Sequence, residues 1–544
     1  MKKKNNAVFR LLIVFAFLVC FELWTFRNII FGGMLIGSNE DGMLAILMTE
    51  HWYKVLCGLE KWNNWISMYP VRNTVALNDM YILHAIFYCP LRFFGVDMYM
   101  AYQAAVICIH ALGSVCMMLF LNRVLKLDAY YSLLGTASFS YGSYYVIKII
   151  HSQLVSLAVV PLIMMAAYLF VYYVISPDRK RRIIWMFIGI LSEVLLFYTS
   201  PYVAEFVLIT LFVYLVSLII ISDKKSLFGG VIRYLKQGWY EPLLGVAFGI
   251  LVMIPFFLVY FPWSAGNVRT YKYASAFFIS FRDLFNVSNG NLLYGRLISR
   301  LPFVFGENTV GLTPVMWLLA ICSIVVVFRN SDRVVRALAI TFVVLFIIPM
   351  KLGGYCFWVV FYAFFPGASG MRVVCRLLLM TLPLLAVLVA YSSDKLSHKL
   401  GGRKGYDTIG SLFVIITIWI VLENSQISGV PSAWTYDSAI ATETDFDVAP
   451  PDDCGCFYLV DSAGMPEQAE FPAYYQGFIK AWRIADKYNV PSINGFGSFT
   501  PPEYGTLYNI YKDSYTEEVA TWIEKNNLQG VYSYDLATKE WKRN

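Results

Sequence analysis

Charged side chains are scarce in this chain. Only 15% of its 544 residues are Asp, Glu, Lys or Arg, whereas soluble domains carry about 25%. Hydrophobic residues make up 58%, and the mean hydropathy is +0.58. This composition excludes a large soluble protein and predicts a mainly α-helical, polytopic membrane protein. The net charge of +7 does not indicate a nucleic-acid partner, because the basic residues lie in short clusters between apolar runs.

The ten cysteines lack any metal-binding or disulfide spacing. Several lie inside apolar runs, and Cys454 and Cys456 are too close together for an ordinary zinc knuckle. The N-terminal segment also lacks a convincing small-residue cleavage site after its lysines and the apolar run at 8–24. Because that run is long enough to span a bilayer, we expect an uncleaved signal anchor. No internal repeat is evident.

A helix needs about 20 apolar residues to cross a bilayer. Eleven candidate spans are found, at 8–28, 99–122, 130–148, 153–175, 183–199, 202–222, 239–260, 311–328, 335–350, 372–391 and 407–422. With the N-terminal lysines in the cytoplasm, every basic cluster between spans falls on the same side, as the positive-inside rule requires. A twelfth span at 80–95 would break this agreement. We therefore expect 80–95 and 43–58 to form helices at the outer surface.

These spans divide the chain into two regions. Residues 1–422 are predicted to be a transmembrane helix bundle with a large first outer loop at 29–98. Residues 423–544 are predicted to form a small extracytoplasmic α/β domain, since they begin with acidic, Pro-rich sequence and then alternate strand-like and helix-like patterns. About 120 residues is enough for one small domain.

The first outer loop carries candidate catalytic carboxylates. Connections this long usually have a function, and this one contains Glu40, Asp41 and Asp79. A general base must lie within hydrogen-bond reach of the proton that it takes, and Asp41 or Glu40 could act in this way on an acceptor hydroxyl. The alternative for this pair is a solvated loop. Asp79 is either a second active-site carboxylate or the N-cap of the helix at 80–95.

Polar residues at two other outer corners are candidates for binding a substrate. His151 and Gln153 lie between two spans, where polar side chains usually face a cavity or one another. Arg372 and Arg376 are four residues apart and follow the small residues of 366–370. A helix beginning there would offer two guanidiniums and free N–H groups to a phosphate. The alternative is that both arginines are interfacial anchors or partners of buried carboxylates.

Two carboxylates and three cations complete the set of candidates. Glu193 and Glu205 lie in or near apolar spans, where ionisable residues are functional candidates by default. Glu205 follows an outer corner and is expected to face the same cavity. Arg269, Lys272 and Arg282 lie in the long outer loop, where they could attract an anionic lipid head.

Short motifs occur in a fixed order along nearly the whole chain. They are Asp41-Gly42, Glu50-His51-Trp52, Tyr69-Pro70, Asn73-Thr74, Ala76-Leu77-Asn78-Asp79 and Pro90, then His151-Ser152-Gln153, then Phe365-Pro366-Gly367-Ala368-Ser369-Gly370-Met371-Arg372-Val373-Val374-Cys375-Arg376, and in the tail Ile493-Asn494-Gly495-Phe496 with Pro501-Pro502. Taken together, their order resembles that of bacterial GT-C-type integral membrane glycosyltransferases.

The resemblance implies a fold and a reaction. It implies a polytopic helix bundle and a polyprenyl-phosphate-linked sugar as donor, with inversion at the anomeric carbon. Asp41 would be the base, and Arg372 and Arg376 would hold the leaving lipid phosphate, whose developing charge prepositioned cations stabilise. No cofactor is implied with certainty, and dependence on a divalent cation stays open. The tail has no cysteine near Gly530 to pair with Cys454, so we expect no tail disulfide.

The expected partners are the lipid-linked sugar donor, a glycan, lipid or protein acceptor, and the bilayer. The expected location is a bacterial plasma membrane, with the N-terminus in the cytoplasm and the C-terminal domain outside it. Two readings from other classes stay open. One is a transporter or flippase for lipid-linked saccharides, and the other is a non-catalytic assembly factor.

Overall fold

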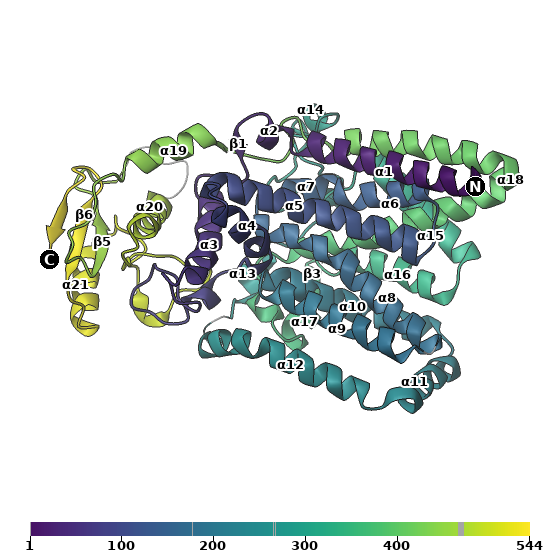
Figure 1. Cartoon of the computed structure of the whole chain (residues 1–544), viewed down its shortest axis with the longest axis horizontal. Helices are drawn as coiled ribbons and strands as arrows, with labels where there is room; N and C mark the ends of the chain where they lie inside the picture. Colours follow the sequence, from purple (N-terminus) through teal and green to yellow (C-terminus); the bar gives the residue numbers. More distant parts are fainter. Residues whose placement is uncertain (1, 177, 265, 267, 466–472) are drawn as a thin grey trace.

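The computed structural model describes residues 2–176, 178–264, 266, 268–465 and 473–544. The chain is mainly helical, and most of its long helices lie side by side in one block (Figure 1). The strands of the C-terminal tail lie at the end of the molecule opposite the N-terminus (Figure 1).

Five helical stretches of the described chain are long and apolar enough to cross a membrane: Met98–Val124, Ser152–Ile175, Pro201–Ile221, Glu241–Trp263 and Val374–Leu400. Shorter apolar helices within the described residues are Leu12–Thr25, Ile82–Phe93, Pro314–Arg329 and Ile409–Asn424. The composition therefore suits a multi-pass membrane protein, and the number of eleven spans stays a prediction.

The sequence starts many of these helices with recognisable signals. Proline occupies the first turn of α8 (Val160–Ile175), α10 (Pro201–Ile221), α12 (Glu241–Tyr260) and α15 (Pro314–Asn330), where a missing N–H costs nothing. Aspartate side chains accept backbone N–H groups at the N-caps of α5 (Met98–Leu119), α6 (Ala129–Ser140), α9 (Arg179–Phe197) and α16 (Arg333–Ile347). Two further helices are α1 (Lys2–Thr25) and α11 (Lys224–Gly238).

The predicted single span at 130–148 is wrong as one helix. It is divided into α6 and α7 (Ser143–Lys148), which are separated at Tyr141 and Gly142. A 3₁₀ segment, η3 (Ser152–Val159), then leads into α8. His151 therefore lies at a corner between two short helical segments.

The two predicted spans at 372–391 and 407–422 are joined in one long helix that turns back on itself. The helical path runs through η7 (Val374–Met380) and α18 (Thr381–Asn424). The Tyr144 hydroxyl donates to the Cys375 carbonyl at 3.1 Å, and the Ser143 N–H donates to Asn424 Oδ1 at 2.9 Å. A straight helix of this length would separate its ends by about 66 Å. The two ends of this helical path instead contact Tyr144 and Ser143, which are adjacent residues of α7. Helix α18 is therefore folded into two arms (Figure 1).

Helices at the two predicted surface segments are present. They are α3 (Asp41–Leu56) and α4 (Ile82–Phe93). In Figure 1, α3 runs across the ends of the bundle helices. Arg92 of α4 donates through Nη2 and Nε to the Glu50 carboxylate of α3, each at 2.8 Å. This two-pronged pairing fixes α4 against α3.

The tail combines a small sheet with two helices. Strand β5 (Cys456–Val460) pairs in parallel with β6 (Val531–Asp535), and β6 pairs antiparallel with β7 (Trp541–Arg543). The helices between β5 and β6 are α20 (Ala473–Tyr488) and α21 (Tyr515–Lys525). Strand β1 (Met34–Leu35) pairs with β4 (Trp434–Thr435), so the first outer loop and the start of the tail lie together.

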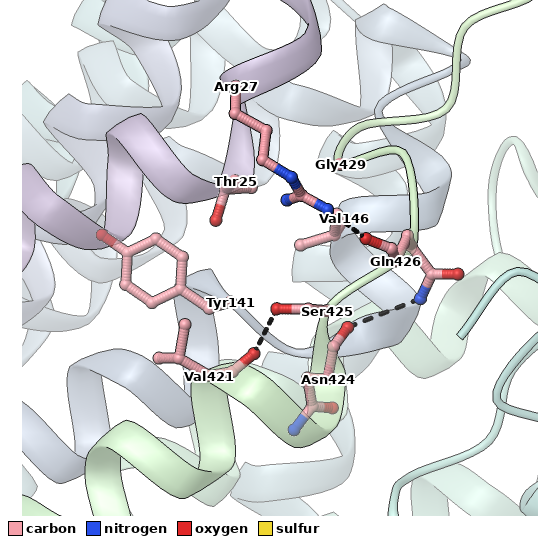
Figure 2. A pocket seen from close by; sticks show the side chains of 9 residues that line it. All are labelled: Thr25, Arg27, Tyr141, Val146, Val421, Asn424, Ser425, Gln426 and Gly429. Atoms are coloured by element: carbon pink, nitrogen blue, oxygen red, sulfur yellow. Dashed lines mark hydrogen bonds between the residues drawn. The ribbon is translucent and has the colours of Figure 1, made fainter. Parts of the chain in front are cut away.

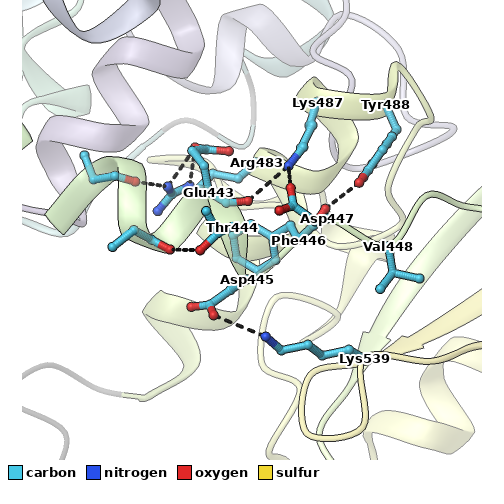
Figure 3. Close-up of polar contacts among 12 residues, drawn as sticks. Glu443, Thr444, Asp445, Phe446, Asp447, Val448, Arg483, Lys487, Tyr488 and Lys539 are labelled. Atoms are coloured by element: carbon cyan, nitrogen blue, oxygen red, sulfur yellow. Dashed lines mark hydrogen bonds and ion pairs between the residues drawn. The ribbon is translucent and has the colours of Figure 1, made fainter. Parts of the chain in front are cut away.

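Ion pairs fix α20 to its neighbours (Figure 3). Arg483 donates through Nη2 and Nε to Glu443 of α19 (Tyr436–Thr444) at 2.7 and 3.0 Å, and Lys487 pairs with Asp447 at 2.6 Å. On its other side, Asp486 pairs with Lys54 of α3 at 2.9 Å. Helix α20 is therefore held directly above α3.

The end of α18 is tied to the end of α1 (Figure 2). The Arg27 guanidinium donates through Nη2 to the carbonyls of Gln426 and Ile427, each at 2.7 Å. Gly429 has φ +86°, and a Cβ there would lie 2.8 Å from the Thr25 carbonyl oxygen. Only glycine allows this close crossing. The contact sets where the tail leaves the bundle.

Candidate active site

Asp41 is the first residue of α3, and Glu40 is its N-cap residue. The Ser38 hydroxyl accepts the N–H of Asp41 at 3.1 Å, which fixes the start of the helix. A Cβ at Gly42 would lie 2.7 Å from the Ile36 carbonyl oxygen, so the loop before α3 packs closely on its first turn. A carboxylate in the first turn is also favoured by the helix dipole. Asp41 thus lies at a helix terminus rather than in a loop, and its catalytic role stays a prediction.

The Asp41 carboxylate faces two other parts of the chain. The Tyr475 hydroxyl of α20 donates to Asp41 Oδ1 at 3.1 Å. His151 Nδ1 lies 3.9 Å from Asp41 Oδ2. The side chain of Asp41 is 42% exposed, so a substrate can reach it. Tyr475, which comes from the tail, is not among the residues that the sequence patterns single out.

A carboxylate that sequence reasoning missed, Glu307, organises the ions behind Asp41. Arg376 donates to it through Nη2, and through Nε at 3.2 Å. Lys148 Nζ donates at 2.8 Å, and His151 Nε2 lies 3.3 Å away. Burial alone would raise the pKa of Glu307, but Arg376, His151 and Lys148 outweigh it and hold that pKa far below its ordinary range. The carboxylate therefore stays ionised.

His151 is placed between Asp41 and Glu307. Burial lowers its pKa, and the nearby Arg376 lowers it further, while Glu307 acts in the opposite direction. Its ring nitrogens approach both carboxylates, one on each side. The structure thus brings the predicted candidates Asp41, His151 and Arg376 into one cluster.

The expected helical arrangement of Arg372 and Arg376 is wrong. The small residues before them form a short 3₁₀ turn, η6 (Ala368–Gly370), and Arg372 precedes η7 rather than lying in an α-helix. The two arginines do not share an α-helical face, and no long helix starts at this turn. Their surroundings also differ, because Arg376 is buried against Glu307.

Arg372 lies close to a second cation. Its backbone N–H donates to the Tyr202 hydroxyl at 2.6 Å, and its guanidinium lies over the Phe277 ring at 5.6 Å. Burial lowers the pKa of Arg269, and the positive charge of Arg372 adds to that effect. Arg269 Nη2 donates to the Ser498 carbonyl at 2.7 Å. Within the described chain, neither guanidinium forms an ion pair with a carboxylate.

Asp79 belongs to the same end of the bundle. The N-cap of α4 is Tyr81, so the alternative reading of Asp79 as that cap is wrong. The Tyr81 hydroxyl donates to Gln153 Oε1 at 3.0 Å. Burial raises the pKa of Asp79 to about 7, although Arg376 and Gln153 act to lower it. Asp79 and Gln153 therefore lie near the Arg376 cluster.

Glu205 lies apart from Asp41, beneath the turn that precedes Arg372. A Cβ on Gly367 would lie 2.2 Å from Glu205 Oε1. Among the described residues, Glu205 Oε2 and both Glu193 carboxylate oxygens are buried without a hydrogen-bond partner. Within the described residues the Glu40 carboxylate forms no ion pair or hydrogen bond, although the backbone N–H and carbonyl of Glu40 are both bonded. In the same part of the chain, no polar contact joins these candidates to the cluster.

No group of three or more His, Cys, Asp or Glu side chains among the described residues is arranged to hold a metal ion.

The described cavities do not contain Asp41. A small one is lined by the residues around Arg27 (Figure 2). A larger one, of about 220 Å³, lies between Met43 and Leu47 of α3, Met98 of α5, and the Glu443–Arg483 pair (Figure 3). The Asp41 side chain lines neither of them and is 42% exposed.

No protein-family model and no curated protein sequence matches the chain. Among solved structures, ArnT from Cupriavidus metallidurans bound to undecaprenyl phosphate aligns with 96% of this chain and 93% of that chain, at 11% identity and a TM-score of 0.46. An oligosaccharyltransferase from Archaeoglobus fulgidus in complex with zinc and sulfate aligns with 95% of this chain and 67% of that chain, at 12% identity and a TM-score of 0.46. At these values no residue role is transferred from either protein.

Proposed function

We propose that this chain is a membrane glycosyltransferase of the GT-C type. It would move a sugar from a polyprenyl-phosphate donor to an extracytoplasmic acceptor, with inversion. The observation that supports this best is the accessible Asp41 carboxylate, which lies beside His151 and the ion pairs of Glu307 at one end of an apolar helix bundle. Asp41 offers a base, and Arg372 with Arg269 offers a site for an anion.

Asp41 would act as the general base. The acceptor hydroxyl oxygen attacks the anomeric carbon, and its proton passes to the Asp41 carboxylate. The bond from that carbon to the phosphate oxygen breaks, and its electron pair leaves with the lipid phosphate. The hydrogen bond from the Tyr475 hydroxyl restricts the orientation of the carboxylate before reaction, and His151 Nδ1 lies 3.9 Å from its other oxygen.

Arg372 and Arg269 would bind the leaving phosphate. Arg376 was the second predicted ligand, but Glu307 already neutralises it. Two cations without a carboxylate partner suit an anion better, because a bound phosphate attracts both guanidiniums and offsets the repulsion between them. Arg376 instead fixes the corner at His151 through their shared contact with Glu307.

The direct test compares cell-surface glycans by mass spectrometry. The samples are cells with wild-type protein, a deletion, Asp41→Asn, and the control Glu524→Gln, which changes an exposed carboxylate of the tail. Loss of a general base lowers the rate about 10²–10⁴-fold. We therefore expect the deletion and Asp41→Asn to lose the same sugar, while the control keeps it. If Asp41→Asn reaches the membrane and keeps the sugar, Asp41 is not the base.

One observation favours a transporter as the second candidate. Glu193 and Glu205 are neighbouring carboxylates in α9 and α10 with buried oxygens that lack partners among the described residues. Unpaired carboxylates at such depth are typical of transport pathways. A transporter in vesicles would move a lipid-linked saccharide across the vesicle membrane without changing it chemically. Asp41→Asn would leave that transport intact.

A further inference from the structure

The tail carries a group of four aromatic rings, one of which, Tyr475, reaches Asp41 through its hydroxyl. Tyr475 and Phe478 come from α20, and Phe496 and Tyr508 come from the segment between α20 and α21. Phe478 is fully buried and stacks on Phe496, with ring centroids 4.8 Å apart and an interplanar angle of 14°. The half-buried rings of Tyr475 and Tyr508 lie 5.4 and 6.0 Å from Phe496.

We propose that Tyr475, Phe496 and Tyr508 form a binding subsite for a pyranose ring of a saccharide acceptor. The inference rests on the proposed function and names its acceptor class. A sugar that lies on these rings would present a hydroxyl to Asp41, because the Tyr475 hydroxyl is already bonded to that carboxylate at 3.1 Å.

The segment that carries Phe496 is fixed on the first outer loop. A Cβ at Gly495 would lie 2.3 Å from Met68 Cγ, and one at Gly497 would lie 2.8 Å from Leu77 Cβ. The Ser498 N–H donates to Asn78 Oδ1 at 2.8 Å. These contacts need two glycines and hold the segment beside Asn78, which directly precedes Asp79. The aromatic subsite is therefore held on the first outer loop, the segment that also carries Asp41.

The chemistry of the subsite suits a sugar better than an acyl chain. A pyranose has an apolar face of C–H groups and a rim of hydroxyls, so it needs aromatic faces next to polar groups. Here the rings adjoin the Tyr475 hydroxyl and the Asp41 carboxylate. The rings also belong to the tail rather than to any of the long apolar helices. An acyl chain would instead need a continuous apolar groove open to the bilayer.

Saturation-transfer NMR on the full-length protein, purified in a detergent without a sugar head group, tests this subsite. The probes are methyl pyranosides of glucose, galactose, mannose and rhamnose, each measured alone. We expect at least one to receive saturation from wild-type protein, and Phe496→Leu to weaken that binding about fivefold. As the control, Tyr355→Ala removes an aromatic ring that is 84% exposed on β3 (Tyr355–Cys356), and it should keep the binding.

Thermal unfolding shows whether the Phe496→Leu protein still folds. If that variant does not fold, the binding measurement is repeated with Tyr508→Leu. The proposal is overturned if no pyranoside binds the wild type, or if the ring variants bind as the wild type does. The glycan experiment separates this failure from that of the proposed function. If Asp41→Asn loses the sugar from the surface glycans but no pyranoside binds the wild type, the proposed function stands and only the aromatic subsite is rejected. Pyranoside binding that depends on Phe496, with glycans unchanged by Asp41→Asn, supports the subsite and contradicts the transferase.

Discussion

One carboxylate, Glu307, determines which arginine near the site is available for a ligand. It contacts Arg376, Lys148 and His151, and its side chain is only 17% exposed. Removing one partner of a buried ion pair leaves the other charge uncompensated, at a cost of about 3–5 kcal/mol. Arg376 is therefore better explained as part of the scaffold, and Arg372 as a ligand-binding group. Two arginines that look equivalent in the sequence thus differ in their surroundings.

The sequence contained only an indirect sign of Glu307. It is the single acidic residue between Asp283 and Asp332, and the outer-side cations Lys148 and Arg376 needed a partner. Its contacts span 69 residues to Arg376 and 159 residues to Lys148. Pairing over such separations depends on how the helices pack, which local patterns do not encode. Asp41 was accessible to sequence reasoning because its loop position and motif are local.

Asp79 makes the stability of the protein depend on pH. Its pKa is raised from an ordinary 3.8 to about 7 because it is buried. Below pH 3.8 the carboxyl is protonated in both states, and above pH 7 folding must bury a charge, so stability is lost between these values. Asp79→Asn removes that cost. We expect the variant to unfold about 2–4 °C higher than the wild type at pH 8, with the difference disappearing towards pH 4.

Thermal unfolding of the purified protein at pH 4, 6 and 8 measures this difference. Asp437→Asn, an exposed aspartate in the first turn of α19, serves as the matched control and should show no such trend. A constant offset between Asp79→Asn and wild type at all three pH values would show that the effect is not protonation of Asp79.

Among the elements, those with a clear local pattern were predictable. The helices at 43–58 and 80–95 were recognised from their apolar runs and are α3 and α4. The division of α6 from α7 at Tyr141 and Gly142 was not, because the apolar run continues through it. The turn before Arg372 was also mistaken for a helix start, since small residues suit both structures. Apolar runs indicate burial in a bilayer more reliably than they indicate helix ends.

The turn at Gly367 should tolerate no side chain. Its φ of +82° disfavours other residues, and a Cβ would lie 2.2 Å from Glu205 Oε1. We expect Gly367→Ala to lower the free energy of unfolding by about 1–3 kcal/mol. Gly353 has φ +57°, and a Cβ there would have no atom within 4 Å. Gly353→Ala therefore carries the backbone strain alone and should cost less.

A double-mutant cycle tests whether the cost of Gly367→Ala comes from contact with Glu205. Glu205→Ala removes the carboxylate, so Gly367→Ala should cost less in that background, although the backbone strain stays. Denaturant or thermal unfolding of the four proteins gives the coupling. If Gly367→Ala costs the same with and without Glu205, the turn does not rest on that carboxylate.

For the whole molecule, two contacts restrict how the chain crosses the membrane. Strand β1 pairs with β4, with Met34 opposite Thr435, and the Tyr475 hydroxyl of the tail reaches Asp41 of the first outer loop. Both ends of the intervening chain must then lie on one side of the membrane. The number of spans between residues 34 and 434 is therefore even. One N-terminal span plus ten others gives the predicted eleven, with the N-terminus and C-terminus on opposite sides.

Reporter fusions test this parity. Alkaline phosphatase folds only outside the cytoplasm, and green fluorescent protein exported by the general secretory route fluoresces only if it stays inside. Fusions after Asn289 and after Asn544 should give phosphatase activity without fluorescence, and a fusion after Lys126 should give the reverse, because basic loops stay in the cytoplasm. The Lys126 fusion serves as the internal control for both reporters. A fluorescent fusion at Asn544 would place the tail inside, where it could not meet Asp41 on the outer surface. That result would contradict both the site and the acceptor subsite, because each requires the first loop and the tail on the same side of the membrane.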